Sequence, residues 1–204
     1  MNYLAHLYLS QDTPLSKAGN LMADFLKHVD LESLPLGIRD GVKNHQATDK
    51  FTDNHPVILD LKSEFDSSFR RFVPIILDVT YDHMLAKSWD LYHDEDIHDF
   101  TARCYAQLRT AEQHMPEVMA NRLRIIAKHN GLASYVGLES VGKTLTAISN
   151  RMRFDNHLDQ AYGEVLQVYH LIEESFHEFF PQLCAFIEAQ NIEHRAKELT
   201  SIPN

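Results

Sequence analysis

The spacing of hydrophobic residues follows a helical period along almost the whole chain. Apolar side chains recur every three or four residues, which is the pattern of amphipathic helices. No segment alternates between apolar and polar residues with the turn residues of a β-hairpin. The pattern predicts an all-α fold with helices at 2–10, 15–28, 37–52, 56–70, 74–92, 96–114, 116–129, 138–151 and 158–190.

Proline and glycine mark several of the expected helix ends. Proline is tolerated in the first turn of a helix, and glycine commonly follows the last turn. Gly131 follows three polar residues and predicts a helix stop. We expect residues 1–204 to form a single helical domain, in which 158–204 supply a long packing helix and a tail. Four prolines precede amphipathic runs: Pro56, Pro74, Pro116 and Pro181.

The composition is that of a folded cytoplasmic protein. The chain has 204 residues, 44% hydrophobic and 24% charged, which is enough to bury a core without covalent staples. Cys104 and Cys184 are the only cysteines, so neither a disulfide framework nor a zinc cluster is expected. The apolar N-terminus lacks the basic start and cleavage site of a signal peptide. No apolar run approaches the roughly 18 residues of a membrane span.

The formal net charge is −10. General nucleic-acid binding requires a basic surface, so the composition argues against a nucleic-acid partner.

Histidine and aspartate recur on helix faces that should point into the core. In the helix predicted at 37–52, His45 and Asp49 continue the stripe formed by Ile38 and Val42. A buried carboxylate costs free energy unless a cation or another partner pairs with it. The inward position of Asp49 therefore predicts such a partner.

Three other predicted helices carry the same kind of residue. Asp78 and Asp82 lie four residues apart on an apolar face, where two carboxylates repel each other unless a cation lies between them. His83 lies at the edge of that face. His6 belongs to a first helix that is apolar nearly all round, and Asp24 borders the apolar face of the second.

Each of these residues alone has an ordinary structural explanation. An inward histidine is usually a satisfied core side chain, and an inward aspartate is usually a helix cap or half of an ion pair. Their convergence from four helices favours a metal centre. Imidazole mixed with carboxylate suits Mn²⁺, Mg²⁺ or Fe²⁺ better than a structural zinc site.

Five segments of the chain resemble the acyl carrier protein phosphodiesterase family, also called acyl carrier protein hydrolyase. The resemblance is strongest over residues 1–90, and Ser149–Arg153 is similar to a later family segment. The segments are Asn2–Leu7, Gly19–Phe25, His45–Asp49, Thr52–Asn54, and Leu77–Val79 followed by Asp82-His83.

The resemblance implies a single helical domain related to the HD-domain phosphohydrolases. It also implies Mn²⁺-dependent hydrolysis of holo acyl carrier protein to the apo form and 4′-phosphopantetheine, a reaction linked to fatty acid biosynthesis. Mg²⁺ is the alternative ion. Carried over position by position, it points to a site formed mainly by residues 1–90, at His6, Asp24, His45, Asp49, Asp78, Asp82 and His83.

The expected roles divide these residues into ligands and catalytic groups. Asp24, His45, Asp78 and Asp82 are expected to hold the metal, with Asp78 either a ligand or in the surrounding shell. The catalytic groups are expected to be Asp49, which would orient His45, and His6 or His83 as general acid for the departing serine. His6 could instead be a further ligand.

Two features depart from the family pattern. Gln46 stands where the resemblance implies a basic residue, so one phosphate-binding charge is missing or is supplied elsewhere. The adjacent His-Asp pair of HD proteins is absent, unless Asp82-His83 serves in reversed order.

The implied partner is itself strongly acidic, as is this chain. Two such proteins associate slowly unless a local patch has the opposite sign. The candidate patches, each of which could equally be a solvated helix face, are Arg70-Arg71, Arg122 with Arg124 and Lys128, and Arg151 with Arg153.

Residues 137–144 match the phosphate-binding motif G-x-x-x-x-G-K-T. That motif functions between a buried strand and a helix of a parallel sheet. Residues 133–136 are too short and weakly apolar for such a strand, and the 60 residues that follow Thr144 indicate helix. We therefore reject a nucleotide-binding loop and expect a turn followed by an amphipathic helix.

Two other functions remain open on the sequence alone. The same metal site could hydrolyse a nucleotide or another small phosphoester. The chain could also be a non-catalytic helical module that docks on a partner protein, with its inward His and Asp residues paired to each other.

Overall fold

The computed structural model describes residues 1–193, which contain helices and no strand. The predicted all-α fold, including a long C-terminal helix, is therefore confirmed. Short 3₁₀ turns join several helices, among them Ala23–Phe25, Trp89–Leu91 and Ala133–Val136. The α-helices are α1 (Tyr3–Tyr8), α2 (Pro14–Met22), α3 (Leu36–Asn54), α4 (Pro56–Lys62), α5 (Val73–Lys87), α6 (Ile97–Thr110), α7 (Glu117–Lys128), α8 (Glu139–Ser149), α9 (Ala161–Gln167) and α10 (Tyr169–Gln190).

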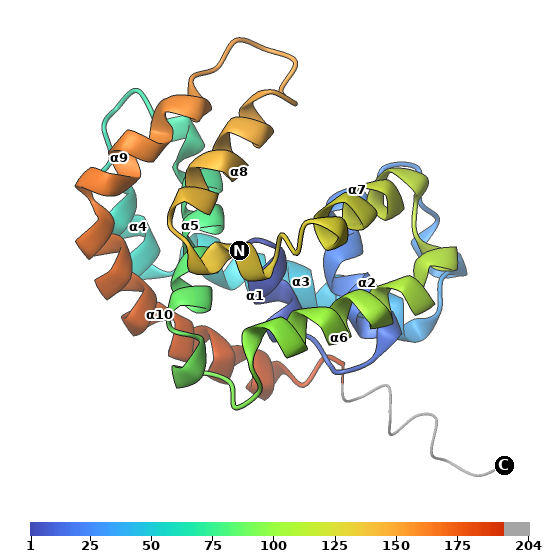
Figure 1. Cartoon of the computed structure of the whole chain (residues 1–204). Coiled ribbons are helices and arrows are strands. Elements are labelled where there is room, and N and C mark those ends of the chain that lie inside the picture. Colours follow the sequence, from blue (N-terminus) through green and yellow to red (C-terminus); the bar gives the residue numbers. More distant parts are fainter. Residues whose placement is uncertain (194–204) are drawn as a thin grey trace, which may run out of the picture.

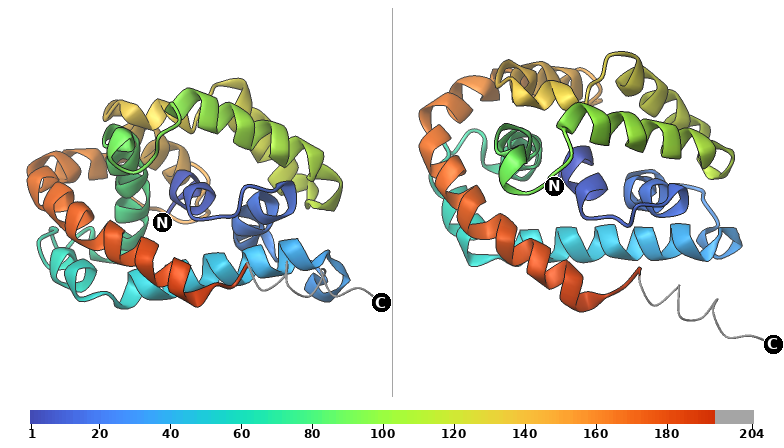
Figure 2. Two further views of the ribbon diagram at one scale, coloured as in Figure 1. Left: turned by 90° about the horizontal axis from the view of Figure 1, so that it is seen from below. Right: turned by 60° about the horizontal axis from the view of Figure 1, so that its bottom comes forward.

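The first helix lies at the centre of the molecule (Figure 1). Leu4, Ala5 and Leu7 are fully buried, as expected for a helix that is apolar nearly all round. In Figure 2, α1 and α2 lie between α6 on one side and α3 on the other. The long helix α10 packs against α3, α4 and α5. Elements from the whole described length of the chain thus surround α1.

Two glycines let α2 and α3 cross in backbone contact. A Cβ atom on Gly41 would lie 2.8 Å from the carbonyl oxygen of Ser16 and 2.9 Å from the Cα of Gly19. A Cβ atom on Gly19 would overlap the carbonyl oxygen of Ile38. This close crossing brings the end of α2 next to the part of α3 that carries the candidate site residues.

Several predicted helices end earlier than expected. The segment predicted at 56–70 is helical only to Lys62, because Ser63 and Asp66 form local side-chain bonds to the backbone that compete with helix continuation. The segment predicted at 158–190 is interrupted at Val168, which separates α9 from α10. The tail expected after that helix lies mostly at 194–204, outside the described residues.

Two predicted helix signals act differently from expectation. Pro181 lies inside α10, so the prediction that it precedes a helix is wrong. The helix α7 does stop before Gly131, but Asn130 is the residue with positive φ, at 47°. The Gly131 amide donates to the carbonyl of Ile126 at 2.8 Å, which is the bond of a Schellman motif.

The rejection of a nucleotide-binding loop agrees with the structure. Residues 133–136 form a 3₁₀ turn, not a strand, and Lys143 lies within α8. Both cysteines are free thiols. Among the described helices, none is long and apolar enough to cross a membrane.

We predict that Gly41→Ala lowers the free energy of unfolding by about 1–3 kcal/mol, because the added methyl group meets backbone atoms that cannot move aside. Gly163→Ala is the matched control, since a Cβ there meets no atom of the described residues within 4 Å. This control should raise stability by up to about 1 kcal/mol, the gain of alanine over glycine in a helix. Urea unfolding of both variants measures the difference, and equal stabilities would contradict the role of the crossing.

Candidate functional site

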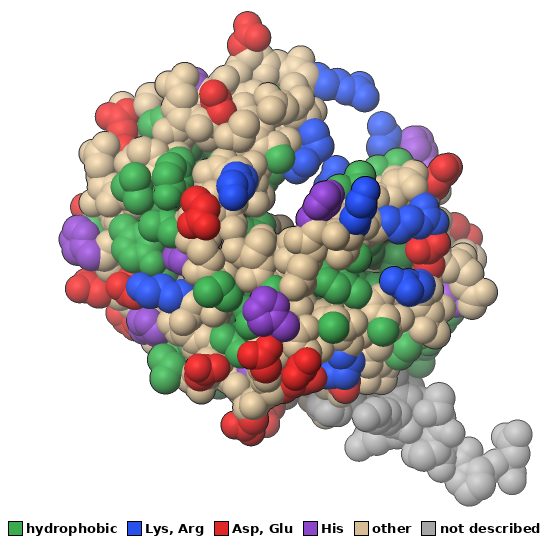
Figure 3. All heavy atoms as spheres, in the orientation of Figure 1, with side chains coloured by type: hydrophobic (Ala, Val, Ile, Leu, Met, Phe, Trp, Pro, Cys, Tyr) green, Lys and Arg blue, Asp and Glu red, His purple; other side chains and the backbone are tan. Residues whose placement is uncertain are grey.

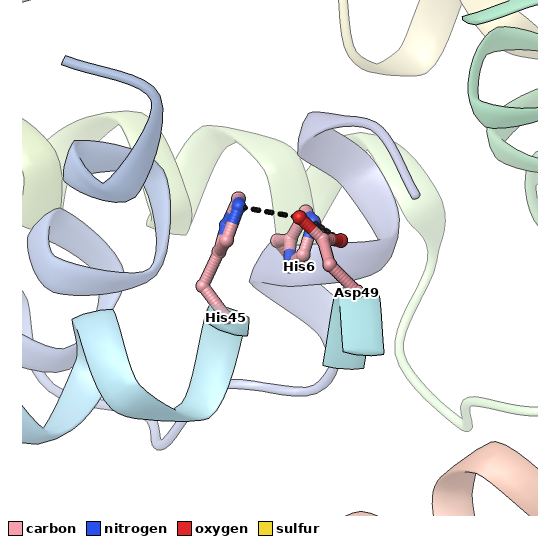
Figure 4. A group of neighbouring side chains, drawn as sticks. All are labelled: His6, His45 and Asp49. Atoms are coloured by element: carbon pink, nitrogen blue, oxygen red, sulfur yellow. Dashed lines mark ion pairs between the residues drawn. The ribbon is translucent and has the colours of Figure 1, made fainter. Parts of the chain in front are cut away.

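Two helices bring two imidazoles and a carboxylate together. His45 and Asp49 lie one turn apart on the inward face of α3, and His6 projects from α1 (Figure 4). The His6 and His45 rings are stacked, with centroids 3.7 Å apart and planes inclined by 12°. Both rings are almost fully buried. The inward stripe predicted for α3 therefore faces the buried first helix.

Asp49 contacts both imidazoles. Its Oδ2 lies 3.0 Å from His45 Nε2, and its Oδ1 lies 3.3 Å from His6 Nε2. One potential ligand atom from each of the three residues lies within 4.8 Å of the others. A single ion could therefore contact all three side chains after small adjustments.

The orientation of His45 is fixed by a backbone carbonyl. His45 Nδ1 donates to the carbonyl of Asn20 at 2.6 Å. The side chain of Asn20 is itself held by Asn44 and by Glu193, at 3.0 and 3.1 Å. With its Nδ1–H engaged, His45 presents Nε2 toward Asp49, which is the usual arrangement of a metal-binding histidine.

Burial and neighbouring charges set the protonation of this group. Burial, followed by the neighbouring His45, lowers the pKa of His6 to about 3, so its imidazole is neutral at pH 7. Burial also opposes charge on His45, but its bond to Asp49 and the nearby carboxylates raise its pKa overall. Burial opposes charge on Asp49 too, yet its bonds to the two imidazoles lower its pKa. A neutral imidazole beside an ionised carboxylate is the form that binds metals.

The residues present fit a divalent ion. Buried His6 Nδ1 has no hydrogen-bond partner within the described part of the chain. Imidazole and carboxylate together suit Mn²⁺ and related ions. A bound cation would also balance the charge of the Asp49 carboxylate, whose side chain is 41% exposed.

Asp24 and Asp78 flank this group from two other elements. Asp24 follows α2, and its Oδ1 lies 3.7 Å from His45 Nε2. Asp78 on α5 accepts a 2.7 Å bond from the Met1 amino group, which also lies 3.6 Å from Asp49. Burial opposes the charge of that amino group, but Asp78 and Asp49 outweigh it and raise its pKa to about 10. The protonated Met1 amino group thus bridges Asp49 and Asp78.

Asp82 caps the buried first helix. Its two carboxylate oxygens accept bonds from the amides of Leu4 and Ala5, at 2.8 and 3.0 Å. Burial raises the pKa of Asp82 to about 7, although both amide bonds favour the ionised form. Its geometry matches the ordinary explanation of an inward aspartate as a helix cap, and its role as a ligand stays a prediction.

His83 faces a different part of the molecule. Its Nδ1 lies 2.7 Å from the carbonyl of Tyr135, and its Nε2 lies 2.9 Å from the Tyr169 hydroxyl. Burial lowers the pKa of His83. Both ring nitrogens are therefore engaged with groups outside the cluster of His6, His45 and Asp49, and its catalytic role stays a prediction.

Sequence reasoning missed the backbone groups of the site. The Asn20 carbonyl orients His45, and the carbonyl of Met1 lies 3.1 Å from His6 Nε2. Every residue carries a carbonyl, so residue type gives no signal for these contacts. The only available signal for Asn20 was its position inside the segment Gly19–Phe25, which carries the family resemblance.

The chain is similar to proteins of one family. The family model described as acyl carrier protein phosphodiesterase matches residues 1–183. A Salmonella dublin protein named acyl carrier protein phosphodiesterase is 30% identical over 186 residues, covering 91% of this chain and 96% of the relative. An Escherichia coli protein of the same name is 29% identical over 184 residues, covering 90% and 95%. No solved structure matches the chain.

We predict that His45→Ala and Asp49→Ala weaken Mn²⁺ binding by at least about a hundredfold. Loss of an outer-shell partner alone typically costs about 10–100-fold, and these residues would contact the ion directly. Asp53→Ala is the matched control on the same helix, because Asp53 is exposed and outside the cluster. Titration calorimetry on metal-stripped, C-terminally tagged protein gives the affinities, and equal affinity in all four proteins would contradict the site.

Proposed function

The chain belongs to the acyl carrier protein phosphodiesterase family, and we propose that it hydrolyses the bond between the carrier's serine and 4′-phosphopantetheine. Water would add to phosphorus and the P–O(serine) bond would break, giving apo acyl carrier protein and free 4′-phosphopantetheine. The match over residues 1–183, which include the whole His6–His45–Asp49 cluster, carries this proposal. A cytoplasmic location and a place in fatty acid metabolism follow from that substrate as parts of the proposal.

The proposed cofactor is Mn²⁺, with Mg²⁺ as the alternative. His6, His45 and Asp49 would hold the ion, and Asp24 is placed to complete the set. A bound ion would neutralise phosphoryl charge and lower the pKa of a water molecule. The further ligand roles expected for Asp78 and Asp82 have less support, because each already bonds to the N-terminal segment.

The chain's own residues would orient and balance this centre. The Asn20 carbonyl holds His45 in one orientation, and Asp49 fixes both imidazoles. Asp24 is half exposed at the edge of the cluster, so an ion that it helps to hold would stay accessible to water. The general acid for the departing serine stays an open part of the proposal: His6 is neutral and is assigned here to the ion, and both ring nitrogens of His83 face Tyr135 and Tyr169.

We predict that metal-stripped protein leaves holo acyl carrier protein unchanged and that added Mn²⁺ restores its conversion. The intact mass of the carrier should fall by one phosphopantetheinyl group. Asp49→Ala should abolish the conversion and Asp53→Ala should retain it. Hydrolysis of small phosphodiesters or nucleotides, with the carrier left intact, would instead favour the nucleotide-type function.

Association with an acidic carrier requires a local cationic surface, because this chain has a net charge of −10. The predicted patch of Arg122, Arg124 and Lys128 does not form one surface. Arg124 pairs with Glu112 toward α6, whereas Arg122 faces a groove on the side of α8. The groove that Arg122 faces also contains Arg151, and it is the better candidate for binding the carrier.

We predict that kcat/KM for holo acyl carrier protein falls about tenfold or more between 50 and 500 mM NaCl, since salt screens attraction between charged surfaces. Stopped assays by intact mass at several salt concentrations measure the slope. A small phosphodiester substrate, if turned over, serves as the control for direct effects of salt on catalysis. A flat response would contradict electrostatic docking.

A further inference from the structure

A groove of about 1050 Å³ separates α7 from α8 and reaches the candidate site. Figure 3, in the orientation of Figure 1, shows a hollow between α7 and α8, with Lys and Arg side chains at its rim. Asp24, which lies beside His45, forms part of the lining. The lining also includes the apolar side chains of Val118, Ile125, Ile126, Ile148 and Met152 and the cationic side chains of Arg122, Lys143 and Arg151.

The three cations of the groove have no carboxylate partner among the described residues. Within residues 1–193, Arg122 donates only to the Tyr3 hydroxyl, at 3.3 Å, and it lies over the Phe25 ring. Neither Lys143 nor Arg151 forms a salt bridge within residues 1–193. By contrast Arg124, two positions from Arg122, is paired with Glu112. Cations without carboxylate partners are notable in a chain with ten excess negative charges.

Arg122 of α7 and Arg151, which follows α8, line the same groove. Burial, followed by the charge of Arg122, lowers the pKa of Arg151. An anion between two guanidinium groups would relieve that repulsion, and guanidinium binds phosphate oxygens through paired hydrogen bonds. Because both side chains line the same groove, the two guanidinium groups are available to one anion.

This pair lies next to the candidate metal centre. The Tyr3 hydroxyl bonds to Arg122, and the charges of Asp24 and Arg151 both reach it. Asp24 in turn lies 3.7 Å from His45. Asp24 and the two arginines line the same groove, so an anion held by Arg122 and Arg151 would lie in the groove that Asp24 borders.

Two apolar side chains on the α7 side of the groove are strongly exposed. Val118 and Ile125 are 67% and 64% exposed, although both belong to an amphipathic helix with a buried face. Exposed apolar side chains beside a cationic pair suit a ligand with a phosphate head and a flexible, partly apolar tail. A phosphopantetheine arm joins its phosphate to a chain in which methyl and methylene groups are separated by a hydroxyl and two amides, and an attached acyl chain extends it with a wholly apolar end.

We propose that the α7–α8 groove binds the phosphopantetheine arm of the acyl carrier protein. The phosphate lies against Arg122 and Arg151, and the pantetheine chain with any acyl group lies along Ile125 and Ile148. This inference rests on the proposed function. In this proposal, two arginines outside the His–Asp cluster position the phosphodiester.

Binding to metal-stripped protein tests the phosphate end. We expect Arg122→Ala and Arg151→Ala each to weaken binding of free 4′-phosphopantetheine by about 10–100-fold, the range of a hydrogen bond to a charged group. Arg122→Lys should restore part of the affinity. Arg124→Ala is the control on the same helix. Unchanged affinity in both groove variants, or an equal loss in Arg124→Ala, would overturn the proposal.

Kinetics test the apolar end. Ile125→Glu should raise KM for decanoyl acyl carrier protein about tenfold or more and leave kcat unchanged. Leu91→Glu is the control, because Leu91 is also strongly exposed and lies outside the groove. An equal KM for both variants would overturn the assignment of the acyl chain.

The two proposals fail separately. Turnover of holo acyl carrier protein that is insensitive to Arg122→Ala and Arg151→Ala would overturn the groove and leave the function standing. No turnover by the unchanged protein, together with arginine-dependent binding of 4′-phosphopantetheine, would support the groove and overturn the function.

Discussion

A helix buried at the centre of a protein cannot leave its first amide groups unpaired, because water does not reach them. In this chain Asp82 of α5 supplies both acceptors for Leu4 and Ala5 of α1. The position of α1 depends on that contact, and the position of His6 depends on α1. The stacking of His6 on His45 therefore depends on bonds made at the N-terminal end of α1.

The second constraint is the backbone contact between α2 and α3. With no side chain at Gly19 or Gly41, the two helices approach closely enough for the Asn20 carbonyl to reach His45. The same approach places Asp24 at the edge of the cluster. The crossing of α2 and α3 thus has two effects. It brings the Asn20 carbonyl to His45, whose ring it orients, and it places the half-exposed Asp24 carboxylate beside that ring.

Charge is distributed unevenly over this fold. The chain is acidic, its centre holds several carboxylates, and the groove between α7 and α8 concentrates three cations without carboxylate partners in the described structure. A cationic groove that ends at a cluster of imidazole and carboxylate groups suits an anionic substrate approached by its phosphate. The hydrophobic wall of α7 then offers a surface to whatever is attached to that phosphate.

Periodicity alone determined the helical class, the inward direction of His45 and Asp49, and the absence of a nucleotide-binding strand before Lys143. These depend on local spacing, which a helix converts directly into a face. The segments resembling a known family also identified that family from the sequence.

Spacing could not decide what each inward residue meets. Asp78 and Asp82 share one apolar face, yet one bonds to an amino group and the other caps α1. The basic residues of α7 likewise divide between a salt bridge and a groove. The physical reason is that the packing of elements distant in sequence determines which groups an inward side chain contacts. In addition, backbone acceptors such as the Asn20 carbonyl cannot be recognised from residue type, because every residue has one.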